Sequence, residues 1–114
     1  AAVANSGGHS WLYYFTRQRP GAGGAKLGAY HGAELPSVFD THDVWLPTQS
    51  ADRSLTAAVM DYWVGFARLG VPGADGQPRW PLYGSDGGQV MELGANIGAV
   101  ELFDEDLCRV LGPR

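Results

Sequence analysis

Two stretches of the chain repeat apolar residues at the spacing of an α-helix. We predict a long amphipathic helix over residues 53–69, with Asp52 or Ser50 able to accept the free N–H groups at its start and Gly70 at its end. The apolar stripe consists of Leu55, Val59, Tyr62, Phe66 and Leu69. Met60, Trp63, Val64 and Ala67 widen this stripe. The width predicts a helix that packs on more than one side. Residues 100–111 show the same spacing and predict a final helix.

Other segments have the pattern of β-strands. Residues 11–16 read Trp-Leu-Tyr-Tyr-Phe-Thr, which is aromatic, rich in strand-forming residues and apolar on both faces. This pattern predicts a strand that is covered on both sides, as in the sheets of α/β proteins. Residues 89–93 lie between glycines and predict a second, short strand.

The remaining segments are rich in glycine and proline. The Gly-Ala-Gly-Gly-Ala run at residues 21–25 predicts a flexible surface loop. Residues 34–39 predict a short helix, in which Pro36 fits only the first turn. Residues 71–81 predict a turn-rich loop with an aromatic plug at Trp80.

Length, charge and cysteine content narrow the class of protein. A chain of 114 residues indicates one domain or less, with no internal boundary. The net charge is −4 and the eight Lys and Arg residues are scattered, so nucleic-acid binding has little electrostatic support. No apolar run is long enough to predict a membrane span, and the first residues do not resemble a signal peptide. The single Cys108 has no partner within these residues, and localisation is left open.

His31 is the first candidate for chemistry. It lies in the run Gly-Ala-Tyr-His-Gly, which predicts a tight loop with the imidazole near a cleft. A neutral imidazole can take a proton from a hydroxyl and return it to a leaving group. The alternative from the residues alone is a structural or merely exposed loop histidine. No serine lies in a Gly-x-Ser-x-Gly elbow, and Ser85 comes nearest without matching it.

Other polar clusters predict no further site. The spacing of His9, His31 and His42 matches no zinc-binding pattern, so we expect no metal. The acidic run at residues 104–106 is typical of a solvated turn or helix start, and Cys108 of a small core residue.

Four segments, taken together, resemble a known family. They are WLYYF at residues 11–15, GAYHGAELPSVF at 28–39, MDYWVGFAR at 60–68 and WPLY at 80–83. Their order and spacing resemble the C-terminal part of type-B carboxylesterases, which include para-nitrobenzyl esterases and cholinesterases. The resemblance covers nearly the whole chain and is specific, because four separate motifs occur in the right order.

The resemblance implies an α/β fold, the C-terminal part of an α/β-hydrolase. Its elements would be a core strand, a catalytic-histidine loop, a long amphipathic helix, a short edge strand and a C-terminal helix. His31 matches the histidine of the family's Ser-Glu-His triad, and would be the general base and then the general acid in hydrolysis of a small carboxylic ester. Glu34 matches a nearby glutamate that supports the structure and is not the triad acid. No cofactor is implied.

The serine elbow, the triad acid and the oxyanion loop of the family are not found in these 114 residues. We therefore expect this chain to correspond to the last quarter of such an enzyme and to be inactive alone. Its expected partner is the N-terminal remainder of the esterase or another copy of itself. Two alternatives remain: a non-catalytic, cholinesterase-like binding module, and a truncated domain that associates with itself.

Overall fold

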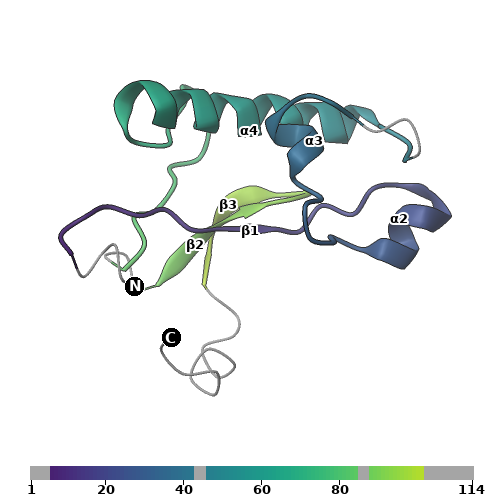
Figure 1. Cartoon of the computed structure of the whole chain (residues 1–114), viewed down its shortest axis with the longest axis horizontal. Coiled ribbons are helices and arrows are strands. Elements are labelled where there is room, and N and C mark those ends of the chain that lie inside the picture. The colour runs from purple at the N-terminus through teal and green to yellow at the C-terminus, as the bar shows by residue number, and fades with distance from the viewer. Residues whose placement is uncertain (1–5, 43–45, 85–87, 102–114) are drawn as a thin grey trace, which may run out of the picture.

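A computed structural model of the chain describes residues 6–42, 46–84 and 88–101. In this part, the long helix α4 lies across one face of a three-stranded sheet, and two short helices lie between and beside them (Figure 1). The elements are β1 (Tyr13–Phe15), α2 (Gly21–Leu27), α3 (Leu35–Val38), α4 (Ser50–Leu69), β2 (Gln89–Leu93) and β3 (Ile97–Glu101). No helix in these described residues has the length and apolar character that a membrane span requires.

The sheet has the order β1-β2-β3. β1 runs parallel to β2, with Tyr13 opposite Met91, whereas β2 and β3 are antiparallel, with Val90 opposite Val100. The predicted strand at residues 89–93 is confirmed. Its expected place at an edge is wrong, because β2 lies between two neighbours.

The core lies between the sheet and α4. It is formed by Leu55, Val59, Tyr62, Trp80, Met91 and Leu93. Trp80 is 5% exposed, and its Nε1 donates a hydrogen bond to Leu12 O at 3.1 Å, so the predicted aromatic plug is confirmed. On the other face of β1, Leu12 is 39% and Tyr14 54% exposed. The described residues therefore cover only one of the two apolar faces that the sequence predicts.

Helix α4 begins three residues before the predicted start. Gln49 N donates to Asp52 Oδ2 at 2.7 Å, and this contact stabilises the first turn. Gly70 has φ 72°, in the left-handed region, and ends the helix as predicted. The inner stripe is buried at Leu55, whereas Phe66 is 50% exposed. Within the described residues, nothing covers the outer side on which Met60 and Val64 lie exposed.

The prediction of a loop at residues 21–25 is wrong, because these residues belong to helix α2. Packing overrides the poor helix propensity of glycine here. A Cβ atom on Gly24 would lie 1.8 Å from Arg19 O, so only glycine allows the helix to approach the irregular segment after β1 this closely.

The prediction of a helix from residue 100 is also wrong at its start. Val100 and Glu101 belong to β3, because pairing with β2 satisfies their backbone groups. The rest of that prediction, residues 102–111, lies outside the described residues. The short helix predicted at 34–39 is confirmed as α3, with Pro36 in its first turn.

Candidate functional site

His31 lies on the loop that joins α2 to α3. Gly28 follows the last residue of α2, and its N–H donates to Gly24 O at 2.8 Å. The next turn closes through a hydrogen bond from Ala33 N to Tyr30 O at 2.9 Å, and Gly32 has φ 86°. These bonds hold the backbone on both sides of His31, while its imidazole is exposed to solvent. The predicted tight loop is confirmed.

The His31 side chain makes no hydrogen bond or ion pair with the residues described by the structure. A histidine that acts as a general base needs a hydroxyl to deprotonate and a carboxylate to orient it. The described part of the chain brings neither group to His31. The three histidines do not form a metal site with acidic residues either, since no cluster of three potential ligands occurs among the described residues.

Glu34 links the histidine loop to the sheet. Tyr13 on β1 donates a long hydrogen bond of 3.5 Å to Glu34 Oε1. Burial raises the pKa of the Tyr13 hydroxyl, and the nearby Glu34 carboxylate raises it further. The loop that carries His31 is thus tied to β1 at the residue three positions beyond the histidine. This geometry fits the supporting role that the sequence predicts for Glu34.

A charged cluster fixes the segment after β1 to the start of α4. Arg17 Nε lies 2.7 Å from Asp52 Oδ1. Arg19 Nη2 donates to Leu46 O at 3.0 Å and to Thr48 Oγ1 at 2.6 Å. Burial alone would raise the pKa of Asp52, but hydrogen bonds from Arg17 and from the Gln49 N–H outweigh it and lower that pKa. Sequence reasoning missed this cluster; its signal was a pair of arginines directly after an aromatic strand.

A second polar contact follows α3. Asp40 has φ 50°, an uncommon conformation for a residue other than glycine. Its Oδ1 lies 3.3 Å from His42 Nε2, which also lies 3.1 Å from Thr56 Oγ1 on α4. The segment that leaves the histidine loop is thereby attached to α4. The sequence carried no pattern that predicted this contact.

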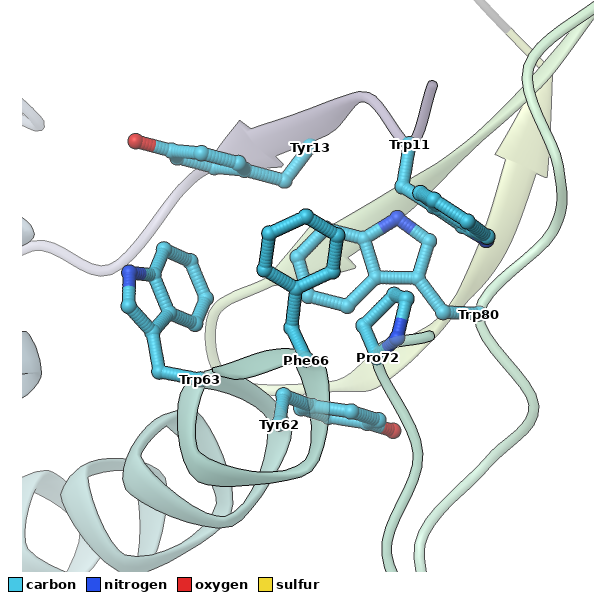
Figure 2. Close-up of a pocket in the computed structure, with 7 residues that line it drawn as sticks. All are labelled: Trp11, Tyr13, Tyr62, Trp63, Phe66, Pro72 and Trp80. Carbon is cyan, nitrogen blue, oxygen red and sulfur yellow. The ribbon is translucent and has the colours of Figure 1, made fainter. Parts of the chain in front are cut away.

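An aromatic pocket lies between β1, α4 and the loop after α4 (Figure 2). Six aromatic side chains line it: Trp11, Tyr13, Tyr62, Trp63, Phe66 and Trp80. Its volume is about 220 Å³. We call these six residues and the space between them the aromatic pocket. Tyr13 belongs both to this pocket and to the contact with Glu34, so the pocket adjoins the support of the histidine loop.

The three-stranded sheet with helix α4 across one face is an α/β arrangement, and comparison with known proteins identifies the family. A model of the carboxylesterase family matches residues 1–108. The chain belongs to this family.

Similar proteins include esterases from animals and bacteria. Liver carboxylesterase of Sus scrofa is 35% identical over 71 residues, which cover 62% of this chain and 12% of that protein. Carboxylesterase 4A of Bos taurus is 32% identical over 84 residues, covering 72% of this chain and 15% of that protein. The chain thus spans a small fraction of the length of these relatives.

Solved structures share the fold. An esterase of Clostridium hathewayi superposes with a TM-score of 0.78 at 24% identity, covering 94% of this chain and 21% of that one. A PNB esterase superposes with a TM-score of 0.75 at 22% identity, covering 92% of this chain and 21% of that one. The arrangement of strands and helices is therefore that of part of an α/β-hydrolase.

Proposed function

We propose that this chain is the C-terminal segment of a serine carboxylesterase and that His31 is its catalytic base. The observation that carries the proposal is the position of His31. It stands exposed on a loop held by hydrogen bonds, within a motif that resembles the catalytic-histidine motif of the family to which the chain belongs. A base on a well-held loop can be presented to a substrate without further ordering.

In the proposed reaction, a serine of the N-terminal remainder attacks the carbonyl carbon of a carboxylic ester. His31 takes the proton from the serine Oγ as the new C–O bond forms, and gives it to the departing alcohol oxygen as the acyl–oxygen bond breaks. In the second half, His31 takes a proton from water, which attacks the acyl group, and returns it to the serine. A glutamate of the remainder would orient the imidazole.

The proposed partner is the N-terminal remainder of the esterase. Two exposed features of β1 support this part of the proposal. Leu12 and Tyr14 leave the outer face of the strand uncovered by the described residues, and β1 pairs with β2 along only one of its edges there. A further strand and helix packed at these surfaces would complete a sheet buried on both faces, as parallel sheets require. The chain alone should therefore hydrolyse no ester.

Coexpression of this chain with the upstream segment of its own esterase tests the proposal. The assembled protein should cleave a short-chain p-nitrophenyl ester, and His31→Ala should lower kcat by at least about a thousandfold. His9→Ala is the matched control, because it removes another exposed histidine and should leave kcat unchanged. Turnover that persists in the His31→Ala protein would refute the role of His31.

A further inference from the structure

The rings of the aromatic pocket, whose arrangement Figure 2 shows, differ in how far they are exposed to solvent. Tyr62 is completely buried and Trp80 is 5% exposed, so these two rings form the floor. Phe66 is 50% exposed and lies at the mouth. A half-exposed ring at the open side of an apolar pocket can contact a ligand that enters it.

The rings of the pocket hold one another in place. Tyr62 and Trp80 meet edge to face, with their centroids 5.2 Å apart and an interplanar angle of 89°. Trp63 lies 5.7 Å from Trp80, and Trp11 lies 5.8 Å from Phe66. Such contacts favour a single arrangement of the rings. The pocket is thus preformed, and a ligand would not have to order it.

The polar atoms of the two floor residues already make hydrogen bonds within the protein. Tyr62 OH donates to Pro78 O at 2.5 Å, and Trp80 Nε1 donates to Leu12 O. Tyr13 OH donates to Glu34. A ligand that reaches the floor therefore meets ring carbons and finds no free hydroxyl there, which favours an apolar group.

Charge also limits the ligand. No Asp, Glu, Lys or Arg is among the residues that line the pocket. A cation would lose water on entry and would find ring faces but no carboxylate to offset that loss. A neutral group avoids this cost.

We propose that the aromatic pocket binds one neutral aromatic ring of a small molecule. A dry apolar cavity of about 150 Å³ accommodates benzene, so the 220 Å³ found here suits a ring with a small substituent. Drug-sized ligands occupy pockets of about 300 Å³ or more, so this pocket holds one ring and any larger substituent would extend through its open mouth. Edge-to-face contacts with Trp63, Phe66 and Trp80 would recognise the ring. The proposal does not depend on the role of His31.

Titration of the 114-residue chain with benzyl alcohol, followed by NMR of the tryptophan indole N–H signals, tests this inference. We expect saturable shifts with a Kd on the order of 1 mM, as for other ligands with few heavy atoms. Phe66→Ala should weaken binding about fivefold, because it removes one ring contact. Phe39→Ala removes a ring that is 66% exposed and outside the pocket, and should leave the Kd unchanged.

Four outcomes would overturn the proposal. The first two are shifts that rise linearly without saturation, and an equal loss of affinity for benzyl alcohol in Phe66→Ala and Phe39→Ala. The other two are tighter binding of tetramethylammonium than of benzyl alcohol, and loss of binding when the chain is assembled with the esterase remainder. The last outcome would show that the remainder covers the pocket. Circular dichroism of each variant verifies its fold. His31→Ala should bind benzyl alcohol like the parent chain, so failure of this inference and failure of the proposed function are distinguishable.

Discussion

Asp52 at the start of α4 joins Arg17, which follows β1, through a contact of 2.7 Å between Oδ1 and Nε. The two residues are separated by two helices and the histidine loop in the sequence. This ion pair, with only 3% of the Asp52 side chain exposed, attaches the sheet to the helix that covers it.

Asp52→Asn should therefore destabilise the protein. The substitution leaves the Arg17 guanidinium without its carboxylate, and breaking a buried pair on one side costs about 3 kcal/mol. Urea unfolding followed by tryptophan fluorescence would measure the change. Asp61→Asn is the matched control, because Asp61 lies on the same helix but is exposed, and it should change the unfolding free energy by less than about 0.5 kcal/mol.

Acid should lower the unfolding free energy of the protein by protonating the same Asp52 carboxylate. The pKa of Asp52 is lower in the folded chain than in the unfolded chain, so its contribution is complete above the unfolded value of about 4. That contribution is lost as the pH falls through the lower folded value. We expect the parent chain to lose more unfolding free energy than Asp52→Asn between about pH 5 and pH 2. Parallel slopes for the two proteins would contradict the assignment.

Two tyrosine hydroxyls should lose their protons at a higher pH than an exposed tyrosine does. Burial raises the pKa of Tyr13 and of Tyr62, and the Glu34 carboxylate raises that of Tyr13 further. Because these folded pKa values exceed the unfolded ones, the stability they provide is complete below about pH 10 and is lost at higher pH. Absorbance of tyrosinate should rise in two steps, of which the second accompanies unfolding. Tyr13→Phe and Tyr62→Phe should each reduce the second step.

Gly24→Ala should disrupt helix α2. The added Cβ would lie 1.8 Å from Arg19 O, so the helix must move away from the segment that Arg19 anchors. A forced shift of this kind costs about 2 kcal/mol. Gly73→Ala is the control, because nothing lies within 4 Å of its added Cβ. Thermal unfolding should show a lower Tm for Gly24→Ala alone.

The pattern of apolar residues within a segment was sufficient to predict some of the helices and strands. The periodic stripe around Leu55 and Val59 predicted α4, and the apolar run around Met91 predicted β2. Trp80 was placed correctly because a lone tryptophan between turn residues has few alternatives to burial.

Contacts between distant segments could not be predicted in this way. The close approach of Gly24 to Arg19 O shows in the sequence only as a glycine-rich run, and Val100 lies in a strand because it pairs with Val90. The candidate site likewise has one part that the sequence predicts and another that only the fold brings together. The motif around His31 is local and could be recognised, whereas the Tyr13–Glu34 contact and the six rings of the aromatic pocket come together only in the fold.

The parallel pairing of β1 with β2 has a consequence for how the chain folds. Tyr13 and Met91 face each other although 78 positions (91 − 13) separate them in the sequence. The entropy of closing so long a loop must be lost before the ladder forms, and folding dominated by such distant contacts is slow. Helix α4 can form early from its own sequence, whereas the edge of β1 that pairs with β2 stays unpaired until residues 89–93 have been synthesised. Until then, the nascent chain exposes one edge of its most aromatic strand, and aggregation should begin at that edge.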